Sequence, residues 1–168
     1  LELRDSGAVE AIGIAAGPIP LLLDYVRTGA FDAVLTHNRF TLVDRSALPL
    51  LAEARSRGMT VFNAAPFGAG VLAAGVRPGA RYGYRPATEP VIAWVGRAQD
   101  ICDRHGVPLA AAALHFSLRS PLVDSTVVGV RTAARLRELE TLVDTRVPEG
   151  LWAELDAIGP TPDPLEGM

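Results

Sequence analysis

The sequence contains no lysine, a single cysteine and no long apolar run, and each absence removes a class of protein. All 16 basic residues are arginines, and they face 19 acidic residues, so the net charge is −3. This balance leaves no cationic excess to hold a phosphodiester backbone, and no dense arginine cluster occurs. We therefore expect no nucleic-acid binding.

The one cysteine, Cys102, cannot form an internal disulfide or supply a cysteine-rich zinc site, which favours a cytoplasmic protein. The longest apolar stretches, such as residues 110–114, are far shorter than the roughly 20 residues of a membrane-spanning helix. Residues 1–5 resemble the last turn of a helix, not a signal peptide, and suggest an element that begins upstream. We expect no membrane span and, because no metal-ligand spacing occurs, no metal site.

What the sequence does contain is enough apolar material, 49% of its residues, for one packed domain. Short apolar runs alternate with longer helical stretches, a pattern typical of βαβ units. Because these runs do not alternate with polar residues, they predict strands that are covered on both faces in a parallel sheet. The predicted strands are 9–15, 33–36, 59–64 and 126–130. The predicted helices are 20–27, 46–57, 90–105, 108–119, 133–143 and 148–158.

Two α/β architectures fit this alternation: half of a (β/α)8 barrel, or an open, doubly wound sheet. Either one leaves strand edges unpaired, and half a barrel also exposes its interior, so the chain needs a partner or a missing half. Local signals mark one helix in particular. Ser46 is a suitable N-cap, and Gly58 follows Arg55 and Arg57 as a residue just beyond the C-terminus.

The segment 61–72 is the first candidate binding site. A strand ends near Ala64, and Pro66, Gly68 and Gly70 then form a turn whose amides could approach a diphosphate closely. A tight connection that uses glycine for steric reasons alone remains the alternative. The spacing of Gly68, Gly70 and Ala73 also matches a dinucleotide fingerprint, but proline and glycine in the following residues do not form the helix and second strand that this fingerprint requires.

The segment 125–139 is the second candidate. A strand ends at Gly129, and Arg131 and Thr132 stand where the next helix begins, so its N-terminal dipole, a hydroxyl and guanidinium groups converge. Arg135 and Glu138 are three residues apart and share a helix face near this end. In barrels, the loops after the last two strands are a frequent phosphate site.

Taken in order, several motifs make the chain resemble the C-terminal half of an aldo-keto reductase. These are N-A-A-P-F-G-A-G-V-L at 63–72, a helix ending in H-G-V, P-L-A-A-A-A-L-H-F-S-L at 108–118 and V-V-G-V-R-T-A-A-R-L-R-E-L at 127–139. The segment H-N-R-F-T-L-V-D at 37–44 is similar to that of the D-threo-aldose, L-galactose and pyridoxal dehydrogenase subgroup.

The resemblance implies that residues 1–168 form strands 5 to 8 of a (β/α)8 TIM barrel, with their helices. It also implies an NAD(P)-dependent oxidoreductase that acts on an aldose-like sugar or a small aldehyde or ketone. The residues implied to bind the nicotinamide nucleotide are Pro66, Phe67, Gly68, Gly70, Leu72, Gly129, Arg131, Thr132, Arg135 and Glu138. The residues expected at the substrate mouth are His37, Asn38, Arg39, Tyr82 and Tyr84.

The sequence departs from the family pattern at several cofactor contacts. Ala15 and Ala16 replace the Ser-Asn pair that grips the carboxamide, and Ala64 replaces an aromatic residue that stacks on the nicotinamide. Gly129 and Leu139 stand where many NADP-preferring members carry Lys and Asn. These changes favour the use of both nucleotides, or of NAD.

The family's chemistry uses a Tyr whose pKa is lowered by a Lys, both from the first four strands. Because this sequence has no lysine, the pair cannot form within it, and we expect no catalytic residue here and no turnover by the isolated chain. Two alternatives remain open. One is a non-catalytic half-barrel that self-associates and binds a phosphorylated ligand, and the other is a barrel enzyme that acts on a sugar phosphate.

Overall fold

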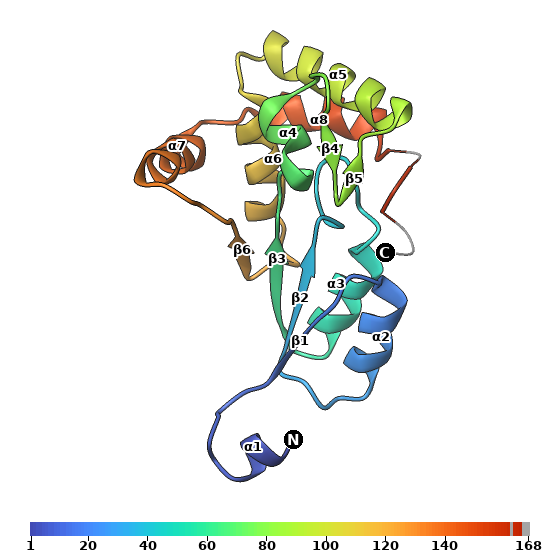
Figure 1. The fold of residues 1–168 in the computed structure, drawn as a ribbon, viewed down its shortest axis with the longest axis vertical. Coiled ribbons are helices and arrows are strands. Elements are labelled where there is room, and N and C mark those ends of the chain that lie inside the picture. Colours follow the sequence, from blue (N-terminus) through green and yellow to red (C-terminus); the bar gives the residue numbers. More distant parts are fainter. Residues whose placement is uncertain (162, 166–168) are drawn as a thin grey trace.

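The computed structural model describes residues 1–161 and 163–165 and contains one four-stranded parallel sheet with helices around it (Figure 1). The strand order in the sheet is β1-β2-β3-β6. Its strands are β1 (Gly13–Ala15), β2 (Ala33–His37), β3 (Thr60–Ala64) and β6 (Ser125–Val127). A separate antiparallel hairpin pairs β4 (Arg81–Tyr82) with β5 (Arg85–Pro86). The predicted parallel sheet is confirmed.

Eight helices precede, connect or follow the strands of this sheet in the described residues. They are α1 (Glu2–Asp5), α2 (Ile19–Arg27), α3 (Leu48–Ser56), α4 (Val71–Ala74), α5 (Glu89–Arg104), α6 (Leu109–Leu118), α7 (Ala133–Asp144) and α8 (Glu149–Ile158). A single 3-10 turn, η1 (Gly68–Gly70), precedes α4. Neighbouring strands follow the chain order without a reversal. The doubly wound alternative is therefore excluded, because the order of such a sheet reverses at a switch point.

One face of the sheet is packed and the other is not. Val34 of β2 and Val61 of β3 are buried in one cluster with Leu22 of α2 and Leu50 of α3. The alternate residues, which point to the opposite face, stay partly exposed, and Val127 of β6 is 41% exposed. The prediction of strands covered on both faces is therefore wrong for the described residues. Only the helix-bearing face is covered.

A second cluster fills the end of the molecule where α5 and α8 lie, opposite the end that carries α1 (Figure 1). Trp94 of α5 is fully buried, and its indole N–H donates to the carbonyl of Gly159 at 2.6 Å. Cys102 is buried in the same cluster. This cluster supports the segments that follow β3, because Val71 and Leu72 of α4 belong to it.

Element ends differ from the predictions at three places. The predicted strand 9–15 is ordered as a strand only at Gly13–Ala15, and the predicted strand 126–130 ends at Val127. Ser46 is not an N-cap: α3 begins at Leu48, and the Ser46 N–H donates to Asp44 Oδ1 at 2.8 Å. The prediction for Gly58 is confirmed, since it follows the end of α3 with a φ of 71°.

Candidate functional site

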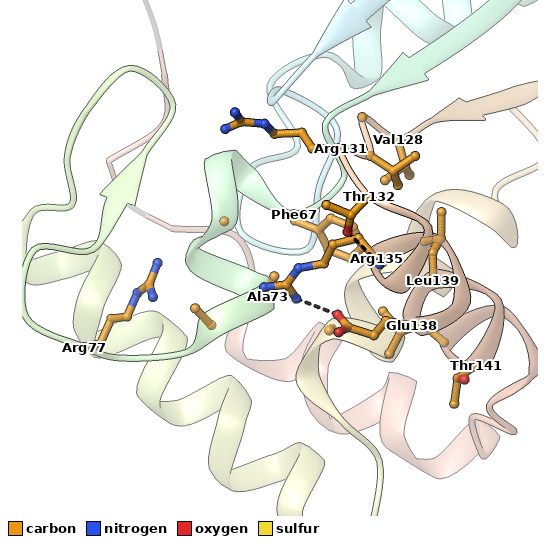
Figure 2. Close-up of a pocket in the computed structure, with 16 residues that line it drawn as sticks. Phe67, Ala73, Arg77, Val128, Arg131, Thr132, Arg135, Glu138, Leu139 and Thr141 are labelled. Atoms are coloured by element: carbon orange, nitrogen blue, oxygen red, sulfur yellow. Dashed lines mark hydrogen bonds and ion pairs between the residues drawn. The ribbon is translucent and has the colours of Figure 1, made fainter.

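A cavity of about 1150 Å³ lies beyond the carboxyl ends of β3 and β6 (Figure 2). Its lining comes from the segments after β3 and β6, together with α6 and α7. These two segments meet because β3 and β6 are neighbours in the sheet. Ala64 pairs with Val127, and the Ala65 N–H donates to the Val127 carbonyl at 3.1 Å. Parallel neighbours leave the sheet at one edge, so the turns that follow them share a rim.

The turn after β3 presents only part of its predicted set to the cavity. Phe67 and Gly70 line it, whereas Pro66, Gly68 and Leu72 are buried beneath. The Gly68 N–H donates to the Ala65 carbonyl and the Gly70 N–H to the Phe67 carbonyl, at 3.1 and 3.0 Å. Both amides are thus used inside the turn. A Cβ on Gly68 would meet Val71 Cγ1 at 3.3 Å, so glycine has a steric reason at this position.

The segment after β6 lines the other side with Gly129, Arg131, Thr132, Arg135 and Glu138, all five residues predicted there. Thr132 is the N-cap of α7, and its Oγ1 accepts a hydrogen bond from the Arg135 N–H at 3.2 Å. The Arg135 side chain forms an ion pair with Glu138, with Nη1 and Oε2 2.5 Å apart, which agrees with the shared helix face that the three-residue spacing predicted. The five residues predicted in the segment after β6 therefore all line this side of the cavity.

Arg77 also lines the cavity but was not among the predicted residues. It follows α4 in a segment whose proline and glycine residues indicated only a loop. Ala73 and Ala74 of α4 and Ala110 of α6 line the cavity too. Alanines carry no functional signal in a sequence, and an arginine in a loop resembles any solvated charge. Only the fold brings these residues to the rim.

The predicted substrate mouth is divided by the structure into exposed and buried residues. The ring of His37, at the end of β2, packs edge-on against Tyr84 with centroids 5.9 Å apart, and Tyr84 is 64% exposed. Burial and the charge of Arg39 lower the pKa of His37 below its ordinary value, so the imidazole is neutral at pH 7. Asn38 and Arg39 are both buried, and Arg39 Nη1 donates to the His37 carbonyl at 3.3 Å.

Tyr82 lies in the core and not at the mouth, which corrects the expectation that its loop covers substrate. Its side chain is fully buried, and its phenol donates to Asp44 Oδ2 at 2.7 Å. Burial, and then the Asp44 charge, raise the pKa of Tyr82 above its ordinary value, so the phenol stays protonated. Asp44 also accepts a hydrogen bond from the Leu165 N–H at 2.8 Å. Asp44 thereby joins the hairpin to the C-terminal segment.

Residues 1–161 and 163–165 form neither a metal-ligand cluster nor a helix suited to cross a membrane. Three or more His, Cys, Asp and Glu side chains do not come together as a metal site anywhere in these residues. None of the helices formed by these residues combines the length and the apolar character needed to cross a bilayer.

The sequence of this chain matches a known family. The family model described as "Aldo/keto reductase family" matches residues 1–160, so the chain belongs to the aldo/keto reductase family. It is 33% identical over 159 residues to pyridoxal 4-dehydrogenase from Microbacterium luteolum, covering 94% of this chain and 46% of that protein. It is 34% identical over 156 residues to D-threo-aldose 1-dehydrogenase from a Pseudomonas species, covering 92% and 47%.

Solved structures show the same fold. The aldo-keto reductase AKR11C1 from Bacillus halodurans, in its holo form, matches with a TM-score of 0.73 at 16% identity, covering 94% of this chain and 52% of that one. The family and this neighbour indicate an α/β fold of the (β/α)8 type. The chain spans about half the length of the relatives it matches.

Proposed function

We propose that this chain is the C-terminal half of the (β/α)8 barrel of an NAD(P)-dependent oxidoreductase. Three observations support the half-barrel: the strands follow the chain order, one sheet face is uncovered, and the relatives are about twice as long. The uncovered face and the free edges of β1 and β6 are where the other four strands would complete the barrel. The missing half, or a second chain that replaces it, is therefore the partner this surface requires.

The observation that carries the redox function is the shared cavity at the carboxyl edge. The turns after β3 and β6, which we propose bind the nucleotide, line one space of about 1150 Å³. Its volume lies somewhat above the range of about 300 to 1000 Å³ that is usual for ligand sites. Three arginines and one glutamate line it, so an anionic ligand fits better than a neutral one. A nicotinamide nucleotide is such a ligand, and when bound it supplies or accepts a hydride.

The residues of this chain would bind and orient the nucleotide. Four residues of the cavity would surround the adenosine end of the nucleotide: Arg131, Thr132, Arg135 and Glu138. Phe67 and Gly70 form the opposite wall. The exposed Tyr84 beside His37 would contact the substrate, which we propose to be an aldose-like sugar or a small carbonyl compound, because the relatives are named for pyridoxal and D-threo-aldose.

Proton transfer to the substrate would require groups from the other half of the barrel. The sequence has no lysine that could lower the pKa of a tyrosine. Tyr82 cannot replace the missing acid, because its phenol is buried and bound to Asp44. We therefore expect the isolated chain to bind a nucleotide but to transfer no hydride.

The test is a titration of the isolated chain with NADH and NADPH, followed by the change in nucleotide fluorescence. We expect saturable binding that ADP competes away and that glucose 6-phosphate does not. Replacing Ala73 by Trp would fill the cavity and abolish binding, whereas Ala93→Trp, on the exposed face of α5, would not. Displacement of the nucleotide by glucose 6-phosphate and not by ADP would favour a sugar-phosphate site. Robust hydride transfer by the isolated chain would contradict the proposal that catalysis requires the other half of the barrel.

A further inference from the structure

The hairpin of β4 and β5 is held by a short piece of the chain near its C-terminus, residues 163–165, which we call the C-terminal clip. Arg85 of β5 forms an ion pair with Asp163, with Nη2 and Oδ1 2.9 Å apart. The other carboxylate oxygen of Asp163 accepts a hydrogen bond from Thr88 Oγ1 at 2.5 Å. One carboxylate therefore holds both the second strand of the hairpin and the residue that precedes α5.

The contact of Thr88 with the clip replaces a different interaction. Thr88 is the N-cap of α5, a position at which a threonine hydroxyl usually accepts a hydrogen bond from an amide of the first helical turn. The structure describes all of α5, and it shows no cap hydrogen bond to the Thr88 side chain, whose hydroxyl donates to Asp163 instead. The start of α5 thus lacks a stabilising side-chain cap, and the same hydroxyl holds the clip.

The other end of the clip is buried against the hairpin. Leu165 is 1% exposed, and its N–H donates to Asp44 Oδ2 at 2.8 Å. The same oxygen accepts a hydrogen bond from the phenol of Tyr82, in β4, at 2.7 Å. Gly83 packs directly on the Leu165 side chain, because a Cβ added to Gly83 would lie 2.8 Å from both of its Cδ atoms. The clip and the hairpin therefore fit together without room for a further methyl group.

These contacts determine where Tyr84 lies. Tyr84 belongs to the two-residue turn between β4 and β5, and its ring packs edge-on against His37 with centroids 5.9 Å apart. The hairpin has two residue pairs, and a two-stranded hairpin has little stability of its own. The position of Tyr84 must therefore come from contacts outside the ladder, and the clip supplies them on both strands.

We propose that Asp163 is a positioning residue that fastens the hairpin and so presents Tyr84 beside His37, and that release of Asp163 lets the hairpin open. The fastening needs no ligand, whereas its effect on the substrate rests on the proposed function. Asp163 is the contact that can be released, because its side chain and that of Arg85 are 30% and 38% exposed, whereas Leu165 is buried. Neither Asp163 nor Leu165 lines the cavity of about 1150 Å³, so the clip acts on the hairpin and not on the nucleotide.

The hairpin contains a single bond that trypsin can cut, which gives a direct measure of its opening. Trypsin cleaves after arginine but not where proline follows. Arg77 and Arg85 are both followed by proline, so the cleavable bond of this segment is Arg81–Tyr82. Because Tyr82 is buried and paired, the bond can be cut only when the hairpin leaves its packed position. The cleavage rate of the native chain therefore follows the population of the open hairpin.

The experiment compares the parent chain with Asp163→Ala under native conditions. This variant should be cleaved at Arg81 about tenfold faster, because it removes hydrogen bonds to a charged group. The matched control is Asp100→Ala, an exposed aspartate of α5, which removes the same charge elsewhere and should leave the rate unchanged. The exchange of Arg85→Asp together with Asp163→Arg should restore part of the protection, and it adds no cleavable bond because residue 164 is proline.

Two further measurements separate the positioning role from a general loss of stability and from the proposed function. The Arg97–Ala98 bond lies inside α5, so its cleavage reports global unfolding and should be equally slow in all variants. Equal acceleration at Arg81 and Arg97 in Asp163→Ala, or an unchanged rate at Arg81, would overturn the positioning role, and so would failure of the exchange to slow cleavage.

The second measurement is a fluorescence titration with NADH. Asp163→Ala should bind NADH as the parent does, and a loss of binding would contradict a clip that acts on the hairpin alone. If the parent bound no NADH while the cleavage pattern held, the proposed function would fail and the positioning role would stand. In the complete barrel that we propose, Asp163→Ala should raise the KM for the substrate more than it lowers kcat.

Discussion

The two edges of the four-stranded sheet differ in the pairing of their charged side chains and in the conformation of their backbone. At the amino edge, two aspartates that each precede a strand bind the amide of the neighbouring strand. Asp32 Oδ2 accepts from the Ile12 N–H and Asp124 Oδ2 from the Val61 N–H, both at 2.8 Å. Each also pairs with an arginine, Arg4 or Arg55. These charged side chains therefore hold neighbouring strands together at the amino edge.

At the carboxyl edge, the charges and the backbone are left less satisfied. Arg77 and Arg131 have no partner in the described residues, and they line a cavity. The described residues other than glycine with positive φ are Asn38, Ala65 and Ala69, and all three lie in segments that follow β2 or β3. At the amino edge, the corresponding conformation belongs to glycines such as Gly29 and Gly58. Backbone strain of this kind is concentrated at functional sites, which supports our proposal that the amino edge serves stability and the carboxyl edge serves binding.

The largest expected effect tests whether the carboxyl edge also needs a rigid support. Asp44→Ala removes the acceptor of the Tyr82 phenol and of the Leu165 and Ser46 amides. Leaving these donors without a partner should lower the free energy of unfolding by about 3 kcal/mol. Urea denaturation measures it. Tyr82→Phe, which removes one donor only, serves as the control and should cost about 1 kcal/mol. A smaller loss for Asp44→Ala than for Tyr82→Phe would contradict this role.

Asp124→Ala tests the amino edge, and the effect should depend on pH. The Val61 amide, and then Arg55, hold the pKa of Asp124 below its ordinary value of 3.8. The stabilisation is therefore fully present above about pH 4 and is lost as the pH falls through the lowered pKa. We expect Asp124→Ala to lower the free energy of unfolding by about 1 kcal/mol at pH 7 and by less below pH 4. Urea denaturation at several pH values across this range measures the difference. A pH-independent difference would mean that the carboxylate charge contributes nothing.

We expect exchanges of glycine and alanine to change the free energy of unfolding in opposite directions at the two edges. Gly58 has a φ of 71°, and Gly58→Ala should lower the free energy of unfolding by about 1 kcal/mol. Ala69 has a φ of 58° without being glycine, so Ala69→Gly should raise it by about 0.5 kcal/mol. Thermal unfolding of both variants and of the parent chain measures the two changes in the free energy of unfolding. If the two substitutions changed stability in the same direction, the backbone contrast between the edges would not hold.

The smallest effect should come from Tyr84, which is 64% exposed at the hairpin. Tyr84→Ala removes a ring contact with His37 and should change the free energy of unfolding by less than about 0.5 kcal/mol. In the complete barrel that we propose, the same variant should raise the KM for the substrate and leave nucleotide binding unchanged. A large loss of stability would make Tyr84 a structural residue like Tyr82.

The sequence located β2 and β3 to within a residue, because strong apolar runs between glycine turns determine such strands locally. The Arg135–Glu138 pair also follows from helical spacing alone. By contrast, Ser46 and Tyr82 were assigned wrongly for one shared reason. Both are held by Asp44, and the contact with Tyr82 spans 38 residues of sequence. Neither the spacing of residues nor their type reveals such a partner.

The sequence by itself determined the alternation of strands and helices, the family motifs and the absence of lysine, because these depend on residue types and short spacings. Only the tertiary structure decided which sheet face stays open, which tyrosine is buried and that Arg77 reaches the same cavity as Arg131. These features depend on which strands become neighbours, and pairing between strands brings together residues that are far apart along the chain.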